Sequence, residues 1–148
     1  MEQYFKLEFS RGGVYKAQLL TTVAPRTCES FLKALPISTS VLNSSFSGHT
    51  FYFQKSLAIH EVENPVVFGA QPGDIFLNTN VGRAVFEEEI LPPRVLVAYG
   101  TSVVLWNWAG WTPSNHFAKV VEGDLGELWK IGRRLRWEGK EEIKCSLV

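Results

Sequence analysis

Alternating apolar and polar positions predict that this chain is built mainly from β-strands. Residues 4–9 alternate, Gly12 and Gly13 interrupt the pattern, and residues 14–20 resume it with the same period. A period of two places successive side chains on opposite faces of a strand, and glycine readily adopts the positive φ of a tight turn. These residues therefore predict a β-hairpin. Clusters of apolar, β-branched and aromatic residues predict further strands over residues 49–53, 75–78, 84–86, 94–99, 102–106, 116–121 and 143–148.

The segments between these strands are predicted turns and loops. Residues 37–47 are rich in Ser, Thr and Asn, which favours a surface loop with at most a short strand. Gly100 and Thr101 are expected to form a turn between two strands. Residues 107–115 hold two tryptophans, a composition that is unusual for a simple linker.

Two segments change from the strand period to the helical period. In residues 25–35 apolar side chains recur at i, i+3, i+4 and i+7, and Pro25 suits the first turn of a helix. Asp124 is a suitable N-cap for a second helix, and both Trp129 and Trp137 are expected in the core. The buried stripe of that helix is predicted to contain Leu125, Leu128, Trp129 and Leu135.

The order of these elements predicts a mainly β fold, a closed antiparallel β-barrel of about eight strands with two capping helices. The chain has no βαβ alternation and no internal repeat, and a closed barrel leaves no sheet edge exposed. At 148 residues, the whole chain 1–148 is expected to form a single domain.

The charge balance and the cysteine content narrow the class of protein. Fifteen basic residues balance fifteen acidic ones, so neither nucleic acid nor an anionic membrane is an expected partner. No apolar run reaches the roughly 18 residues of a membrane span, and no signal-peptide pattern opens the sequence. Cys28 and Cys145 form no CxxC pair, which favours two reduced structural thiols. We therefore expect a cytoplasmic protein.

Two histidines are the predicted acid–base residues. His116 begins a strand beside the tryptophan-containing loop, and His49 lies in the aromatic run 49–53. Histidine exchanges a proton near neutral pH, which suits general acid or base catalysis. Alternatively, His116 bonds a backbone carbonyl and His49 faces solvent. The three histidines of the chain show neither HxH nor HExxH spacing, so no metal site is predicted.

A run of three carboxylates supplies a further candidate. On an extended segment Glu87 and Glu89 share one face and Glu88 takes the other. A carboxylate in an aromatic pocket has a raised pKa and can act as an acid or base at neutral pH. Glu89 is the predicted catalytic residue and Glu87 a ligand-binding one, although which of the three faces a pocket stays open. The alternative is a solvated acidic face.

Aromatic residues are expected to form the walls of a ligand site, because loop tryptophans often line pockets for planar or cationic molecules. The alternative for the tryptophans is a hydrophobic cluster beneath the loop. The predicted ligand-binding residues, besides Glu87, are Tyr52, Phe53, Tyr99, Trp108, Trp111 and Asn115.

Three segments resemble the cyclophilins in order and approximate spacing. They are residues 24–32, residues 72–77 and residues 116–123, which are similar to the first helix, a middle strand, and the late strand and turn of that family. The resemblance implies a cyclophilin-like fold. A typical prolyl isomerase of the family has an arginine where this chain has Phe53, so the resemblance does not imply that activity. The Asn-His-Phe triplet and Trp137-Glu138-Gly139 are more similar to prokaryotic cyclophilin-like proteins of unassigned function.

The residues and the resemblance together predict a small-molecule enzyme or ligand-binding protein. The expected chemistry is cofactor-independent acid–base work on a small nitrogen-containing or carboxylated compound, because no nucleotide-binding loop and no activated nucleophile is evident. Condensation of an amino acid with a keto acid is included, since some opine-forming synthases are reported to share the fold. Two alternatives stay open: a prolyl isomerase or proline-peptide binder, and a non-catalytic interaction module that forms a homo-oligomer.

Overall fold

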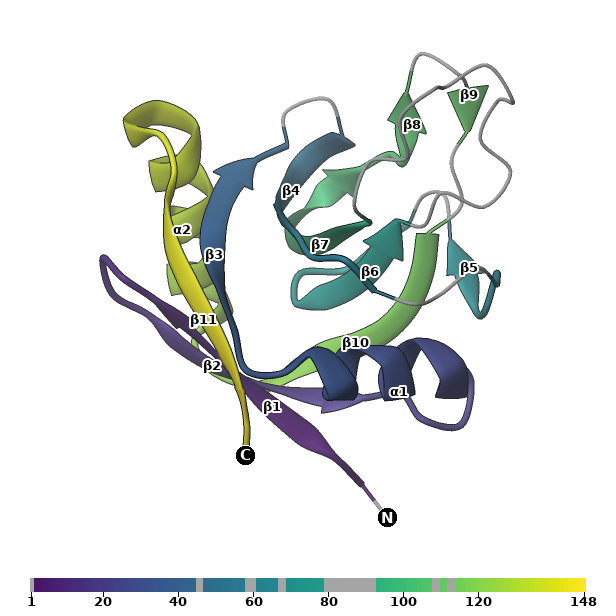
Figure 1. Cartoon of the computed structure of the whole chain (residues 1–148). Helices are drawn as coiled ribbons and strands as arrows, with labels where there is room; N and C mark the ends of the chain where they lie inside the picture. Colours follow the sequence, from purple (N-terminus) through teal and green to yellow (C-terminus); the bar gives the residue numbers. More distant parts are fainter. Residues whose placement is uncertain are drawn as a thin grey trace.

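The computed structural model of the chain describes residues 2–44, 47–57, 61–66, 69–78, 93–107, 110–111 and 114–148, with only the backbone at 106–107 and 110–111. The elements follow one another as shown in Figure 1. They are β1 (Tyr4–Phe9), β2 (Val14–Leu19), α1 (Pro25–Ala34), β3 (Ile37–Asn43), β4 (Gly48–Gln54), β5 (Pro65–Val66), β6 (Asp74–Asn78), β7 (Arg94–Val103), β8 (Trp106–Asn107), β9 (Gly110–Trp111), β10 (Ser114–Glu122), α2 (Leu125–Glu138) and β11 (Glu141–Leu147).

The main sheet closes on itself. Its strands run in the order β2-β1-β11-β3-β4-β7-β6-β10, and a further pairing of β10 with β2 completes a barrel of eight strands. The strand pairings in the described part of the chain are all antiparallel, and β5 adds a short edge to β10. The predicted fold class is confirmed: a mainly β, closed antiparallel barrel with two helices. The predicted β1–β2 hairpin is also confirmed, with positive φ at Gly12 and Gly13.

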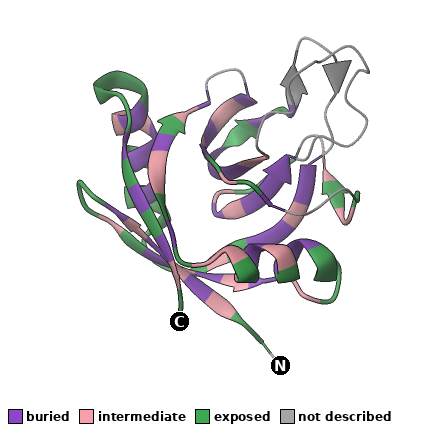
Figure 2. Cartoon of the chain, viewed as in Figure 1, coloured by how far each residue is buried: buried purple, intermediate pink, exposed green. Residues whose placement is uncertain are grey.

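Alternation along the strands fills the barrel interior with apolar side chains. Along β1, Phe5, Leu7 and Phe9 are buried while the residues between them are only partly buried, a pattern that Figure 2 shows on several strands. From α1, the ring of Phe31 packs 4.7 Å from that of Phe5 and 5.1 Å from that of Phe117. Helix α1 therefore extends the interior core at one end of the barrel.

Helix α2 covers the core with a different stripe from the predicted one. Leu128 and Leu135 are buried as expected, and Ile131 joins them. Leu125, Trp129 and Trp137 were predicted to be buried but are 44%, 38% and 71% exposed. The prediction was wrong because the helix turns the 128–131–135 face toward the barrel, which leaves these three side chains toward its outer side.

The start of α2 follows the sequence prediction. Asp124 caps the helix, since its Oδ1 accepts hydrogen bonds from the backbone N–H groups of Gly126 at 2.7 Å and Glu127 at 3.2 Å. A capping carboxylate satisfies N–H groups that have no partner within the helix. No helix in the described part of the chain is long and apolar enough to cross a membrane.

Two predicted breaks in the chain are strands instead. Residues 37–43 form β3, which pairs with β11 and β4, although their composition favoured a loop. Strand β7 continues through Gly100 and Thr101, where a turn was expected. Gly100 serves close packing there, because a Cβ at this position would lie 2.5 Å from Nδ1 of His49 and 2.7 Å from the Trp129 ring.

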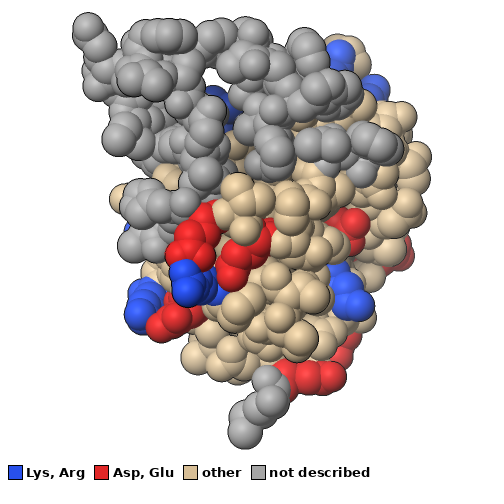
Figure 3. Space-filling model, turned by 90° about the vertical axis from the view of Figure 1, so that its right-hand side faces the viewer, with Lys and Arg blue, Asp and Glu red and all other residues tan. Residues whose placement is uncertain are grey.

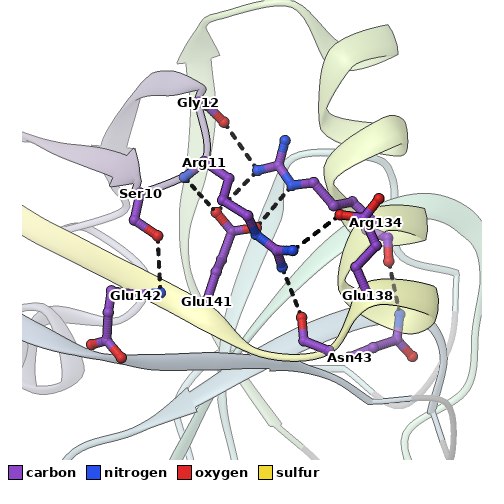
Figure 4. A network of polar contacts seen from close by, with 10 residues as sticks. Ser10, Arg11, Gly12, Asn43, Arg134, Glu138, Glu141 and Glu142 are labelled. Atoms are coloured by element: carbon purple, nitrogen blue, oxygen red, sulfur yellow. Dashed lines mark hydrogen bonds and ion pairs between the residues drawn. The ribbon is translucent and has the colours of Figure 1, made fainter.

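A buried carboxylate joins the β1–β2 turn to α2 and β11 (Figure 4). Nε and Nη2 of Arg134 donate to the two oxygens of Glu141 at 2.9 and 3.1 Å. The backbone N–H of Arg11 donates to the same carboxylate at 3.0 Å, and the Arg11 side chain also contacts Glu138 and the carbonyl of Gly139. Three distant parts of the sequence are thereby held at one point.

Charges of both signs lie side by side on the face that carries α1 (Figure 3). Arg26 forms an ion pair with Glu61, and Lys33 pairs with Glu29 one helical turn away at 3.0 Å. Such exposed pairs contribute little to stability, typically below about 1 kcal/mol. They also leave this face without a dominant charge.

Candidate functional site

A second apolar cluster lies on the outer face of the barrel wall formed by β4, β7, β6 and β10. The antiparallel registers align Tyr52 with Leu96, Leu96 with Phe76, and Phe76 with His116. Because neighbouring strands lie about 4.8 Å apart, this row spans roughly 14 Å. Phe76 and Leu96 are fully buried, and Tyr52 packs against their cluster. The row thus has an apolar middle with a phenol at one end and an imidazole at the other.

A polar row follows the apolar one on the same face. Gln54 pairs with Arg94, Arg94 pairs with Asn78, and the β6–β10 register continues the row toward Ser114. The guanidinium carbon of Arg94 lies 5.3 Å from the centre of the Tyr52 ring. An arginine over an aromatic face gains a cation–π interaction that also orients its N–H groups. Arginine, amide and hydroxyl groups therefore border the apolar floor.

Three buried polar atoms in these rows lack a hydrogen-bond partner within the part of the chain that the structure describes. They are Oδ1 of Asn78, Oγ of Ser114 and Nε2 of His116. Buried polar atoms in native proteins are nearly always paired, and each exception calls for an explanation such as a ligand or an ordered water. Their concentration on one face makes this the candidate site.

His116 is held beside a carboxylate. Its Nε2 lies 3.3 Å from Oδ1 of Asp74, which is within ion-pair range but lacks the alignment of a directed hydrogen bond. Burial alone would raise the pKa of Asp74, but contact with His116, a hydrogen bond from the N–H of Gln71 and the charge of Lys119 together lower it. Asp74 is therefore an anion at neutral pH and lies beside the imidazole of His116.

The backbone of His116 is fixed from the β5 side. Its N–H donates to the carbonyl of Asn64 at 3.1 Å, and the Asn64 side-chain amide donates to the His116 carbonyl at 2.9 Å. Asn64 has a φ of 45°, in the left-handed region that asparagine tolerates better than most residues. These two bonds set the position from which the imidazole extends.

Asn115, a predicted ligand-binding residue, is engaged inside the protein. Its Oδ1 accepts from the N–H of Glu63 at 3.0 Å, and its Nδ2 donates to Oγ1 of Thr27 at 3.1 Å and to the carbonyl of Glu61 at 2.9 Å. The side chain is buried and joins β10 to α1. Through these contacts Asn115 fixes the part of β10 that carries the neighbouring His116.

Glu63 completes that support by binding the first turn of α1. Its Oε1 accepts from the N–H and the hydroxyl of Thr27 at 2.7 and 2.8 Å, and its Oε2 accepts from the N–H of Arg26 at 3.2 Å. Burial alone would raise the pKa of Glu63, but these hydrogen bonds and the charge of Arg26 lower it. The α1 N-cap residue, Ala24, has no side-chain cap, so Glu63 supplies acceptors that the sequence lacks locally.

His49 and Tyr99 lie apart from the candidate site, against α2. The His49 ring lies 5.6 Å from the Tyr99 ring and 4.8 Å from the Trp129 ring. Nδ1 of His49 accepts from the N–H of Ser102 at 3.3 Å, and the Tyr99 hydroxyl accepts from the Asn43 amide at 3.1 Å. Of the predicted site residues whose side chains the structure describes, only Tyr52 and His116 are brought onto the same outer row.

The remaining predicted residues fall in the core or outside the description. Phe53 is fully buried in the barrel interior, on the face of β4 opposite to its neighbour Tyr52. Trp111 lies in β9, where only the backbone is described. Trp108, Glu87, Glu88 and Glu89 lie outside the described residues.

Four polar residues of the site were missed at the sequence level: Asp74, Asn78, Arg94 and Ser114. Each stands at the end of a strand, where a polar residue is ordinarily taken for part of a turn. One feature of the sequence could have pointed to two of them: alternation places Asp74 and Asn78 on the face of β6 opposite to Ile75 and Leu77. Only the strand order reveals that these positions adjoin. Among the described residues, no three His, Cys, Asp or Glu side chains gather as metal ligands would.

Comparison with known proteins identifies relatives in sequence and in fold. Residues 9–147 match the model of a family described as Protein of unknown function (DUF3830). The structure of McbB in complex with tryptophan has a TM-score of 0.68 at 18% identity, covering 96% of this chain and 44% of McbB. The solution structure of the hypothetical protein AF2241 from Archaeoglobus fulgidus has a TM-score of 0.58 at 16% identity, covering 99% of this chain and 95% of that protein.

These likenesses differ in what they establish. No curated protein matches the chain in sequence at a significant level. At identities of 18% and 16%, the two solved structures show a shared fold alone. The chain spans less than half the length of McbB, since it covers 44% of that protein. The closed barrel is compatible with the cyclophilin-like fold that the sequence resemblance implied.

Proposed function

Because the chain belongs to the DUF3830 family of proteins of unknown function, we propose its function from its own residues. The outer face of β4, β7, β6 and β10 binds a small molecule that carries a carboxylate and a nitrogen. The observation that carries this proposal is that the buried Oδ1 of Asn78 and Oγ of Ser114, which have no hydrogen-bond partner among the described residues, lie in the same two rows as Arg94 and His116. Leaving such atoms without a partner costs about 1–3 kcal/mol each, which a bound ligand would recover.

The chemistry of the two rows specifies the ligand groups. An arginine guanidinium has five N–H donors and binds a carboxylate through two of them, so Arg94 can bind a ligand carboxylate while it keeps other contacts. Oδ1 of Asn78, an acceptor, suits a ligand amine or other N–H donor. Phe76 and Leu96 offer an apolar floor for the rest of the molecule. A carboxylate, an amine and an apolar body together describe an amino acid with an apolar side chain.

A fold neighbour supports this class of ligand. McbB has been solved in complex with tryptophan, a molecule that has these three groups. At 18% identity the likeness concerns the barrel and not its residues. It supports the choice of tryptophan as the first probe.

The pair formed by His116 and Asp74 would add acid–base chemistry to binding. The imidazole can take or give a proton at the ligand nitrogen, and the Asp74 carboxylate beside it orients the ring. Condensation of an amine with a keto acid needs only proton transfer as catalysis. The nitrogen attacks the carbonyl carbon, protons move from the nitrogen to the oxygen, and water leaves. Such a step requires no cofactor. The predicted contributions of Glu87 and Glu89 remain part of this proposal.

Calorimetric titration with three related compounds tests the proposal. L-Tryptophan is expected to bind, whereas tryptamine, which lacks the carboxylate, and indole-3-propionate, which lacks the amine, should each bind at least about tenfold more weakly. Arg94→Gln should weaken the binding of tryptophan and indole-3-propionate, which have a carboxylate, but not that of tryptamine. Lys144→Gln, on β11 across the barrel, is the matched control and should change none of the three affinities.

Replacement of the histidine separates function from structure. His116→Gln should lower ligand affinity or activity while leaving the thermal midpoint within a few degrees of the original protein. Equal affinities for all three compounds, or unfolding of the His116→Gln variant, would contradict the proposal.

A second candidate is binding or isomerisation of proline-containing peptides. The observation that favours it is Arg94 on β7, which stands on the outer face next to Tyr52, whereas the family's arginine position is occupied by Phe53. A protease-coupled prolyl isomerisation assay distinguishes the candidates. Turnover that is lost in Arg94→Gln and unaffected by tryptophan would favour the second.

A further inference from the structure

The outer side of α2 carries alternating aromatic rings and guanidinium groups. Trp129, Arg133 and Trp137 follow at i, i+4 and i+8, which places them on one side of the helix. The Arg133 guanidinium carbon lies 5.7 Å from the ring centres of both tryptophans, and that of Arg136 lies 5.3 Å from the Trp137 ring. These cation–π contacts hold the four side chains in place, so little conformational entropy would be lost when a partner binds.

The rings in this arrangement remain open to solvent. Trp137 is 71% exposed, and Trp129 is 38% exposed although its other side packs on His49 and Tyr99. Tryptophan and arginine are the residues most enriched at the energetic centres of protein interfaces. A tryptophan this exposed on a regular helix contributes little to the fold, which leaves association as its physical use.

A groove lies beside Trp137. Its volume is about 380 Å³, and Leu42 and Leu135 supply apolar surface while Arg136 and Lys140 supply positive charge. Asn43 also lines the groove, and its Oδ1 is buried without a partner in the described part of the chain. The groove therefore offers cations and apolar surface, which suits a segment with carboxylates and an apolar side chain.

The surrounding acids do not neutralise this surface. Glu138 is bound by Arg11, and Glu141 is bound by Arg11 and Arg134. Within the described residues, Arg133, Arg136 and Lys140 form no ion pair with a carboxylate. The face is locally cationic in a chain whose net charge is zero.

We propose that this surface, which we call the α2 face and define as Trp129, Arg133, Arg136, Trp137 and Lys140, docks an acidic segment of a partner protein. Carboxylates of the segment pair with the cations, and an apolar side chain packs beside Trp137. Trp129 and Trp137 are eight positions apart on a helix, or about 12 Å, a length that an extended segment covers and a single small anion does not. Nucleic acid is disfavoured, because its binding depends on neutralising many phosphates.

Fluorescence anisotropy with labelled probes tests this assignment on the full chain. The main probe is a peptide of about twelve residues in which Glu alternates with Leu and Phe, and its match has Gln in place of every Glu. A single-stranded oligonucleotide of similar length is the third probe. We expect the acidic peptide to bind at least about tenfold more tightly than the Gln peptide and the oligonucleotide, with affinity falling as salt rises.

Single substitutions locate the binding. Trp137→Ala should weaken binding of the acidic peptide at least about tenfold, as expected for a residue at the centre of an interface. Arg136→Gln should weaken this binding several-fold. Lys130→Gln is the matched control on the same helix, because Lys130 is already paired with Glu127 at 3.0 Å. It should leave the affinity unchanged. Since these side chains are exposed, thermal melting by circular dichroism should be nearly the same for all of these variants.

Several outcomes would overturn the proposal. Equal binding of the Glu and Gln peptides, or of the original protein and Trp137→Ala, would remove the α2 face as the site. Tighter binding of the oligonucleotide would assign the face to nucleic acid. A dimer in sedimentation velocity that Trp137→Ala abolishes would assign it to a second copy of this chain. Absence of binding by every probe up to about millimolar concentration would also reject it. If Trp137→Ala melts early, an Arg136→Gln and Lys140→Gln double variant replaces it.

Discussion

His116 on β10 and Asp74 on β6 face each other on the outer wall of the barrel, with Nε2 of the histidine 3.3 Å from Oδ1 of the aspartate. The apolar ring of Phe76 lies 5.1 Å from the imidazole, so the pair stands between the apolar floor and solvent. A carboxylate beside a partly buried imidazole limits the orientations of its ring. The pair therefore connects the stability of the outer wall to the chemistry proposed for it.

Asp74 should contribute stability that depends on pH. Its folded-state pKa is lowered from 3.8, so the contribution is fully present above about pH 4 and is lost as pH falls through the lower folded-state pKa. The Asp74→Asn variant has no carboxylate at this position and therefore lacks this pH-dependent contribution. Urea midpoints measured between about pH 6 and pH 2 should show a gap between the two proteins that is widest near pH 6 and closes below pH 3.8. A gap that stays constant with pH would contradict this.

Asn115 and Ser114 are adjacent, yet their substitution should have opposite consequences. Asn115→Ala removes three hydrogen bonds and leaves buried partners unpaired, at a cost of about 2–4 kcal/mol in the free energy of unfolding. Ser114→Ala removes a buried hydroxyl without a described partner and should leave stability unchanged or slightly higher. Urea denaturation measures both.

Ligand titration then separates the roles of the two residues. Ser114→Ala should weaken ligand binding if its hydroxyl faces the ligand, while Asn115→Ala, studied at a temperature where it remains folded, should retain most of the affinity. A stable Asn115→Ala variant that has lost binding would instead support the prediction from the sequence that Asn115 contacts the ligand.

Glu141 should be among the polar residues that stability depends on most. Its side chain is 1% exposed and accepts hydrogen bonds from Arg134 and from the backbone of Arg11. Removing the charge deprives the Arg134 guanidinium, on a side chain that is 22% exposed, of its buried carboxylate partner, so Glu141→Gln should cost about 1–3 kcal/mol. Glu142→Gln is the control, because among described residues the carboxylate of this exposed neighbour bonds only the Ser40 hydroxyl, so its replacement should cost less than about 1 kcal/mol. Similar losses for the two variants would contradict the role of the buried network.

The two thiols should be unreactive while the chain is folded. Cys28 and Cys145 are buried, and burial raises the pKa of each thiol to about 12. Since the thiolate is the reactive form, a disulfide reagent at pH 8 should modify neither thiol in the native protein and both in urea. Rapid modification of a native thiol would show local opening at α1 or at β11.

The alternation of apolar residues was sufficient to predict the barrel, and a period of 3.6 was sufficient to predict both helices. The errors arose where tertiary pairing overrides composition. Residues 37–43 are polar for a strand, but β11 and β4 provide backbone partners on both sides. Gly100 looked like a turn residue, whereas it makes room for two aromatic rings. Trp137 looked like a core residue because exposed tryptophans are uncommon.

The candidate site was less predictable than the fold. His116 and Tyr52 were found because histidine and tyrosine suggest chemistry by themselves. Arg94 and Asn78 gain their meaning from being paired neighbours on β7 and β6, and the register that pairs them is not written in either strand alone. Asn115 precedes His116, and because neighbouring residues of a strand point to opposite faces, its side chain bonds Thr27 on α1 while His116 lies on the outer row.

Gly132 tests how closely α2 is pressed on the barrel. A Cβ at this position would lie 2.3 Å from atoms of the Tyr99 ring, so Gly132→Ala forces the helix or the ring to move. The expected cost of about 1–3 kcal/mol exceeds the roughly 1 kcal/mol that alanine gains over glycine within a helix. In a Tyr99→Val background the ring is absent, and the same substitution should become neutral or stabilising. A double-mutant cycle by urea denaturation measures this change of sign. Equal costs in both backgrounds would mean that Gly132 is required by the helix backbone and not by its contact with Tyr99.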